Sequence, residues 1–172
     1  MTFDPAFDHR RSIRLKNFDY TQPGAYFVTI VTHDRKCLFG DIENDCITHT
    51  LAGQCVLAII GALPEHFSIQ INNMVVMPNH VHILLTMLNK ESDTPKSQTD
   101  LRKGSPAHSV SAIVQNLKAN SSRHIHRIVN NQDSVWQRNY YEHIVRNQDD
   151  FDRIYTYIEN NPLTWQKDEL WK

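Results

Sequence analysis

Apolar positions along the chain follow two spacings, and each spacing predicts a different kind of element. Segments rich in aromatic and β-branched residues predict strands at 25–32, 67–77 and 80–88, and part of a strand at 135–145. Apolar residues three and four positions apart predict helices at 48–63, 110–129 and 149–161. The strand, helix, strand, strand order at the start of this series forms half of a ferredoxin-like split unit.

Prolines and capping residues indicate where the helices begin and end. Pro64 and Pro162 follow the first and third predicted helices, and Ser109 is expected to cap the second. The mostly polar segment 41–47 predicts a loop.

Segment 89–107 contains only two apolar side chains and predicts a flexible loop. Too little chain follows this loop to build a second core. We therefore expect a single domain over 1–172, with a tail at 162–172.

The composition is that of an ordinary globular protein. The 172 residues are 40% hydrophobic and 22% charged, and the formal net charge is −1. A near-zero net charge gives no overall sign of nucleic-acid binding, so any DNA contacts must come from local patches. One candidate patch is a basic arm within 1–20, where Arg11 and Arg14 could lie along a phosphate backbone. A solvated terminus is an equal alternative.

Two histidines stand one residue apart in the strand predicted at 80–88. Side chains in a strand alternate between faces, so His80 and His82 share one face and the apolar residues between and after them share the other. Two imidazoles on one rigid face can form half of a metal site. On spacing alone, a pair of histidines on a solvated sheet face is as good an interpretation.

The last predicted helix carries polar groups in register. Its expected buried stripe consists of Phe151, Ile154, Tyr155 and Ile158. Tyr157 lies off that stripe, and residues four apart stack on one helix face, so Arg153, Tyr157 and Asn161 form a row. An exposed tyrosine beside a C-terminal asparagine cap would give the same pattern.

Three motifs in this order resemble a known family. VVMPNHVHILL, VWQRNYYEHIVRN and YTYIENNP are similar to motifs of the single-tyrosine HUH transposases, above all the REP-associated tyrosine transposases related to those of small insertion sequences. The segment RRSIRLKNFDYTQPGAYFVTIVTHDR fits the same group. The resemblance implies an α+β fold, with helices packed on a ferredoxin-like antiparallel sheet. It also implies DNA transposition at hairpin or palindromic elements.

The resemblance assigns roles to four residues. It implies that His80 and His82 bind a metal, Mg²⁺ or Mn²⁺, and that Asn161 completes the metal site. Tyr157 corresponds to the nucleophile, which would cleave single-stranded DNA through a 5′-phosphotyrosine intermediate. A non-cleaving, domesticated DNA- or RNA-hairpin-binding module on the same fold is the alternative, and the intact set of four residues argues against it.

Further basic and aromatic residues are candidate DNA contacts. The candidate phosphate contacts are Lys118, Arg123, Arg138, Arg146 and Arg153. The candidate base-stacking residues are Trp136, Tyr140 and Tyr141. A plain solvated helix face is the alternative for Lys118 and Arg123, and core packing is the alternative for Trp136 and Tyr141.

Other candidates for the chemistry are weaker. His124 and His126 repeat the His-x-His spacing inside a predicted helix, where about 200° separates them. Tyr140 and Tyr141 lack an amide at helical spacing. The absence of an apolar signal core and the three widely spaced cysteines predict a cytoplasmic protein without a membrane segment, bound to the nucleoid when it holds DNA. Monomer and homodimer both remain open, as does the question of whose site the tyrosine helix serves.

Overall fold

The computed structural model describes residues 19, 21–89, 109–130, 132–168 and 170. Its central elements, in chain order, are β1 (Gly24–Val31), α1 (Leu51–Ala62), β4 (Ile69–Val76), β5 (His80–Met87), α2 (Val110–Val129) and β6 (Tyr141–Ile144). The four strands form one antiparallel sheet in the order β4-β5-β1-β6. This order, with a helix after the first and third of the four strands, is the ferredoxin-like arrangement. The predicted fold class is confirmed.

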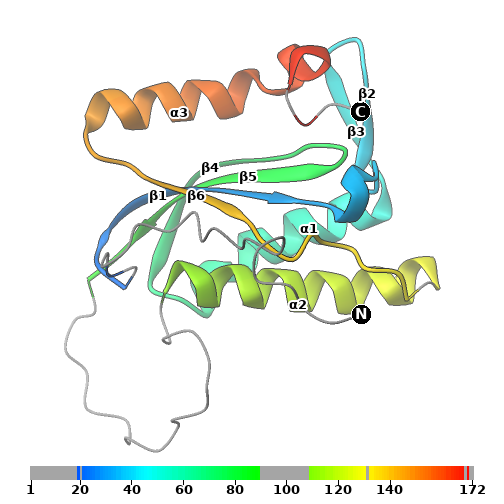
Figure 1. The fold of residues 1–172 in the computed structure, drawn as a ribbon, viewed down its shortest axis with the longest axis horizontal. Helices are drawn as coiled ribbons and strands as arrows, with labels where there is room; N and C mark the ends of the chain where they lie inside the picture. Colours follow the sequence, from blue (N-terminus) through cyan, green and yellow to red (C-terminus); the bar gives the residue numbers. More distant parts are fainter. Residues whose placement is uncertain (1–18, 20, 90–108, 131, 169, 171–172) are drawn as a thin grey trace, which may run out of the picture.

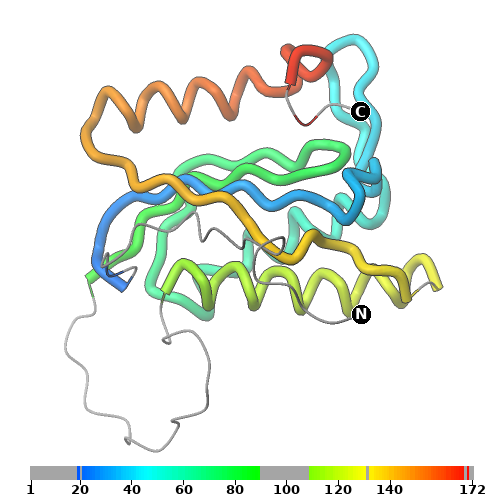
Figure 2. Tube along the Cα trace, viewed as in Figure 1, coloured from blue at the N-terminus to red at the C-terminus, as the bar shows by residue number. Residues whose placement is uncertain are grey.

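Helices cover both faces of this sheet. Helices α1 and α2 lie on one face, and α3 (Gln148–Asn160) crosses the other, as Figures 1 and 2 show. The main hydrophobic core lies between the sheet and the α1–α2 pair, and it includes Ile30, Val81 and Leu117. A second, small cluster joins Leu84 of β5 to Ile154 and Ile158 of α3. Strand β5 is therefore buried on both sides, which explains its nearly continuous apolar sequence.

Polar side chains start each helix by accepting a hydrogen bond from a backbone N–H of the first turn. Thr50 accepts from Gly53, Ser109 from Ala112, and Asn147 from Asp150. The predicted Ser109 cap is confirmed. None of the helices within the described ranges is both long and apolar enough to span a bilayer.

The prediction of a loop at 41–47 was wrong. This segment forms a hairpin of two short strands, β2 (Gly40–Glu43) and β3 (Cys46–His49). Asn44 and Asp45 connect the strands with φ values of 51° and 62°. These two residue types tolerate positive φ better than most, so they suit the two-residue turn that matches strand twist. The surrounding polar residues concealed the strands because the hairpin is largely exposed.

The strand predicted at 67–77 begins at Ile69 and contains a register shift between Ile71 and Asn73. The Asn72 side chain accepts a hydrogen bond from the Thr86 hydroxyl on β5. The turn-prone asparagine pair therefore produces a bulge without ending the strand.

Tyr155 was predicted to be buried in the stripe of α3, and that prediction was wrong. Its side chain is 36% exposed and lies 6.4 Å from Phe151 between ring centroids. The sheet contacts only a narrow strip of this helix, so burial extends to Ile154 and Ile158 and stops short of Tyr155.

The segment predicted as a tail begins with a 3-10 helix, η3 (Pro162–Lys167), which is followed by Asp168. The predicted basic arm lies outside the described residues apart from Asp19. The same holds for the predicted loop at 89–107 apart from Asn89.

Candidate metal and tyrosine site

The two histidines of β5 lie on the face covered by α3. His80 is fully buried and His82 is 3% exposed, so they do not occupy a solvated sheet face. Their Nε2 atoms are 3.1 Å apart. Two nitrogen ligands at right angles around one small divalent ion are separated by about 3 Å. The spacing therefore fits shared coordination of a single ion.

Asn79 fixes the orientation and tautomer of His80. The Asn79 Nδ2 group donates to the carbonyl oxygens of Arg35 and Leu170, at 3.3 and 2.8 Å. Its Oδ1 therefore faces Nδ1 of His80, 2.8 Å away. An amide oxygen only accepts, so Nδ1 of His80 carries the proton and the Nε2 lone pair is available for a metal.

Thr29 and Phe27 of β1 support His82. The Thr29 hydroxyl lies 2.7 Å from Nδ1 of His82, and a hydroxyl can either donate or accept there. The Phe27 ring stacks on the imidazole with a centroid distance of 5.2 Å. These contacts follow from the register, in which Thr29 pairs directly with His82.

Burial keeps both imidazoles neutral. Desolvation lowers the pKa of His80 to about 4, opposed by the nearby carboxylate of Asp168 and the amide of Asn161. Desolvation and the neighbouring His80 lower the pKa of His82. Neutral imidazoles offer lone pairs, which is the form that a metal requires.

Tyr157 of α3 reaches this pair. Its hydroxyl oxygen is 3.3 Å from Nε2 of His82 and its side chain is 42% exposed. The ring meets Phe27 edge to face at 6.1 Å. The hydroxyl therefore lies beside the two histidines while remaining open to a substrate from solvent.

Asn161 caps the C-terminus of α3 and is fully buried. Its Nδ2 group donates to Oδ2 of Asp168 at 2.9 Å. Its Oδ1 atom accepts no hydrogen bond from any residue that the structure describes. A buried acceptor without a donor is costly unless a cation or water satisfies it, so this oxygen fits a metal ligand.

Donor atoms of His80, His82 and Asp168 all lie within 4.8 Å of one another. The Asn161 amide contacts His80 and partly offsets the lowering of its pKa by burial, so the amide oxygen can join a set of nitrogen and oxygen donors that suits a divalent cation. The residues present therefore fit the metal implied by the sequence.

A cleft of about 740 Å³ opens onto Tyr157 and His82. Its walls include three cationic residues that come from separate parts of the chain, Arg35, Arg153 and Lys167. Phe27 and Tyr141 add aromatic surface. Positive charge beside exposed rings suits a nucleic-acid strand, since cations meet phosphates and rings stack on bases.

The structure separates the predicted DNA contacts into groups. Arg153 lines the cleft, where it also donates to Asp150 at 2.5 Å. Arg138 and Arg146 are exposed, and Arg123 donates to Asn120 on its own helix. Arg11 and Arg14 lie outside the described residues.

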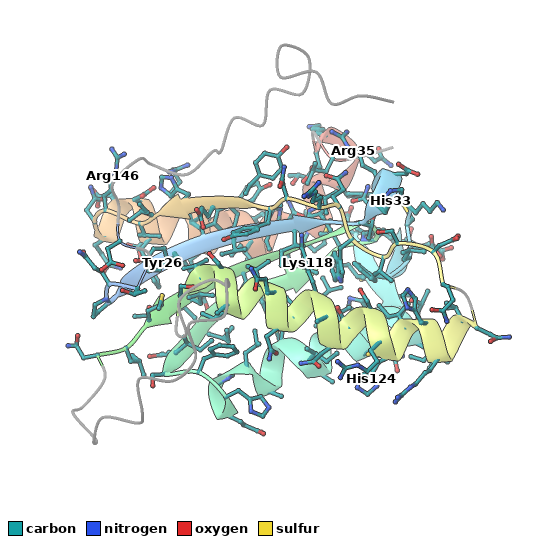
Figure 3. The ribbon with its side chains drawn as sticks, turned by 60° about the horizontal axis from the view of Figure 1, so that its bottom comes forward. Tyr26, His33, Arg35, Lys118, His124 and Arg146 are labelled. Atoms are coloured by element: carbon teal, nitrogen blue, oxygen red, sulfur yellow. The ribbon has the colours of Figure 1, made fainter. Side chains whose placement is uncertain are left out.

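Lys118 has a different environment. Its ammonium reaches from α2 to the segment before β6 (Figure 3) and donates to the carbonyls of Gln137, Arg138 and Asn139. Burial lowers the pKa of this lysine to about 8. These contacts give Lys118 a structural role that the sequence pattern did not indicate.

The three aromatic candidates also separate. Trp136 is a core residue whose ring N–H donates to Ser121, as the packing alternative predicted. Tyr140 is half-buried and donates to Ser111. Tyr141 is 54% exposed and lines the cleft, so the core alternative does not hold for this residue.

Helix geometry points the side chains of the alternative histidine pair in different directions. His124 and His126 lie on α2, and the ring of His126 lies 2.9 Å from the Asp133 carbonyl. Figure 3 shows His124 on the side of α2 away from the sheet.

Comparisons with known proteins show similarity to transposases. The sequence model of the IS200-like transposases matches residues 101–161, a stretch that includes Tyr157 and Asn161. An uncharacterized protein of Haemophilus influenzae is 34% identical over 98% of this chain and 97% of the relative. A putative REP-associated tyrosine transposase of the same organism is 24% identical over 84% of this chain and 73% of the relative.

The chain is similar to the IS200-like transposases over residues 101–161 and to a putative REP-associated tyrosine transposase over most of its length. These similarities support a DNA-processing enzyme with a role in transposition. The family resemblance seen in the sequence is thus confirmed.

Solved structures share the fold. A REP-associated tyrosine transposase bound to a REP hairpin matches with a TM-score of 0.59 and 20% identity, over 88% of this chain and 74% of that one. A putative transposase from Deinococcus radiodurans matches with a TM-score of 0.50 and 18% identity, over 86% of this chain and 97% of that one.

Sequence reasoning missed Asn79, Thr29 and Asp168 at this site. Asn79 directly precedes the histidine motif and could have been found from the sequence, and pairing of the predicted strands would have brought in Thr29. Asp168 follows a short 3-10 helix, whose sequence has no period that places the carboxylate near His80.

Proposed function

We propose that this transposase cleaves and rejoins single-stranded DNA at hairpin elements, using Tyr157 as the nucleophile and a divalent metal held by His80, His82 and Asn161. The observation that carries the proposal is the convergence of one hydroxyl, two neutral imidazoles and one orphaned amide oxygen. A phenol beside three neutral metal donors, at the mouth of a cationic cleft, is more than packing requires.

The proposed metal ligands and the proposed nucleophile have separate roles. His80, His82 and Asn161 would hold Mg²⁺ or Mn²⁺, which supplies polarisation of the scissile phosphate and stabilisation of its developing charge. Tyr157 Oη forms the new bond to phosphorus. The bond between phosphorus and the 3′ oxygen breaks, which leaves a 5′-phosphotyrosine and a free 3′-hydroxyl. One phosphodiester replaces another, so the free 3′-hydroxyl of a second strand can reverse the step without an energy source.

The cleft supports an unpaired strand as substrate. Arg35, Arg153 and Lys167 can neutralise phosphates, and Tyr141 offers an exposed ring for stacking. The fold match to a transposase bound to a REP hairpin supports a hairpin as the recognised element. Hairpin shape would then position the unpaired flank in the cleft.

A covalent adduct tests the nucleophile. Wild-type protein incubated with a labelled hairpin carrying a single-stranded flank and Mn²⁺ should give a labelled protein band on a denaturing gel. Tyr157→Phe should give none while still binding the hairpin. Tyr155→Phe is the matched control, because it removes an exposed hydroxyl from the same helix outside the cleft.

Two results would contradict the proposal. An adduct that persists in Tyr157→Phe and disappears in Tyr141→Phe would transfer the nucleophile to β6. Hairpin binding without any adduct in wild-type protein, with either metal, would favour the non-cleaving binding module.

A further inference from the structure

Asn161 has two chemically different ends, and the structure directs each to a different neighbour. Its Nδ2 group donates to Asp168, and its buried Oδ1 atom is left without a hydrogen bond among the described residues. An amide has nearly the same shape when turned over, so packing alone distinguishes these two orientations poorly. Only the hydrogen-bond partners decide which end faces the histidines.

The choice matters because a metal discriminates between the two ends. The carbonyl oxygen of an amide has lone pairs, whereas its NH₂ group offers only protons. A carboxylate is the opposite partner, since it accepts hydrogen bonds and donates none. We propose that Asp168 is a positioning residue that turns the Asn161 amide so that its oxygen faces the metal. The proposal rests on the metal role given to His80, His82 and Asn161.

Asp168 is itself held in place. Its Oδ1 atom accepts from the Leu170 N–H at 2.7 Å, and its backbone N–H donates to the Trp165 carbonyl at 3.0 Å. Trp165 is mostly buried, with its ring centroid 5.9 Å from that of His80. The η3 segment is therefore anchored against the site, and the carboxylate is presented at a fixed position.

Both carboxylate oxygens of Asp168 accept hydrogen bonds, one from Leu170 and one from Asn161. Each of these oxygens keeps a second lone pair, so the two hydrogen bonds do not exclude direct ligation. The carboxylate lies within 4.8 Å of the histidine donor atoms, so direct ligation is the alternative that a test must separate from positioning.

Metal affinity gives the first test. Asp168→Asn replaces a strict acceptor with a group that can also donate, so the amide at 161 is no longer held in one orientation. Mn²⁺ titration of the DNA-free protein by calorimetry should show roughly 10–100-fold weaker binding, the usual cost of losing a supporting partner. Glu159→Gln, an equal charge change on an exposed residue of α3, should bind as wild type does. Equal affinity of Asp168→Asn and wild type would overturn the proposal.

A double-mutant cycle separates positioning from ligation. Aspartate at position 161 has two equivalent oxygens and needs no orientation. Asp168→Asn should therefore cost much less affinity in an Asn161→Asp background than in the wild-type background. If Asp168→Asn weakens Mn²⁺ binding by the same factor in both backgrounds, Asp168 acts as a ligand or through the electrostatic attraction of its charge. That result would overturn the positioning role.

Side-chain amide protons report on the hydrogen bond without a metal. In ¹⁵N-labelled protein, an Nδ2 proton of Asn161 should exchange slowly with water in wild type and rapidly in Asp168→Asn. The midpoint temperature of thermal unfolding should be the same for both proteins. Rapid exchange in wild type would overturn the proposal. If wild type protects this proton but binds no Mn²⁺, the metal role at the core of the proposed function fails instead, and the role of Asp168 toward a metal falls with it.

Discussion

The hydroxyl of Tyr157 lies 3.3 Å from Nε2 of His82, although 75 residues separate the two along the chain. Local sequence alone does not bring these two residues together. Strand β5 fixes the imidazole, and the contact of Ile154 and Ile158 with Leu84 sets the helix that carries the phenol. The short distance therefore results from packing two separate elements on one sheet face.

Removing one imidazole should separate DNA cleavage from DNA binding. His80→Ala leaves two of the three proposed metal ligands, so adduct formation should fall at least a hundredfold while hairpin affinity changes little. Gel assays of adduct and of hairpin binding measure the two effects. His124→Ala, on the outer side of α2, is the control and should behave as wild type. Equal adduct yields from His80→Ala and wild type in chelator-treated buffer would remove the metal from the proposal.

Mixing two inactive variants should not restore activity. Because Tyr157 reaches His82 within one chain, we expect each molecule to use its own tyrosine. A mixture of Tyr157→Phe and His80→Ala should then form no adduct with hairpin DNA. An adduct in the mixture would mean that the tyrosine helix serves a partner's site, and the protein would have to act as a dimer.

Lys118 should matter for stability and little for DNA. Lys118→Met leaves three backbone carbonyls without their shared donor, which should lower the free energy of unfolding by about 1–3 kcal/mol. Urea denaturation measures this loss. Arg123→Met, on an exposed position of the same helix, should change stability by less than about 0.5 kcal/mol. A large loss of hairpin affinity at full stability would instead support the phosphate contact that the sequence pattern predicted.

Asp150 should contribute stability that acid removes. Hydrogen bonds from His143 and Arg153 lower the pKa of this carboxyl from 3.8 to about 2. A depressed pKa stabilises the folded state at pH values above the unfolded pKa, and the contribution disappears as pH falls through the folded pKa. The difference in urea midpoint between wild type and Asp150→Asn should therefore be larger at about pH 5 than at about pH 2.5. Asp149→Asn controls for the loss of a first-turn carboxylate, and a pH-independent difference would contradict the assignment.

The sequence was informative wherever a residue's position depends on the period of its own element. The two-residue period of a strand placed His80 and His82 on one face, and the four-residue spacing of a helix placed Tyr157 and Asn161 together. Residues that reach the site through pairing or irregular turns were not predictable this way. Thr29 depends on strand register, and Asp168 depends on the path of η3.

Two errors have a related cause. Burial of Tyr155 was inferred from its apolar spacing, but the width of the contact between α3 and the sheet decides how far burial extends. The β2–β3 hairpin was missed because an exposed ribbon needs no alternating apolar face. In both cases the deciding factor was the neighbouring surface, which a single element's pattern does not contain.

Helix α3 carries Tyr157 and ends at Asn161, and a small apolar cluster together with hydrogen bonds to Asn73 and His143 attaches it to the sheet. Detaching this helix should cost less free energy than unfolding the main core. Any such departure takes the nucleophile and the amide ligand together and leaves both histidines behind on β5. The proposed site is therefore either complete or absent. Molecules in which α3 has detached keep their main hydrophobic core but cannot begin DNA cleavage.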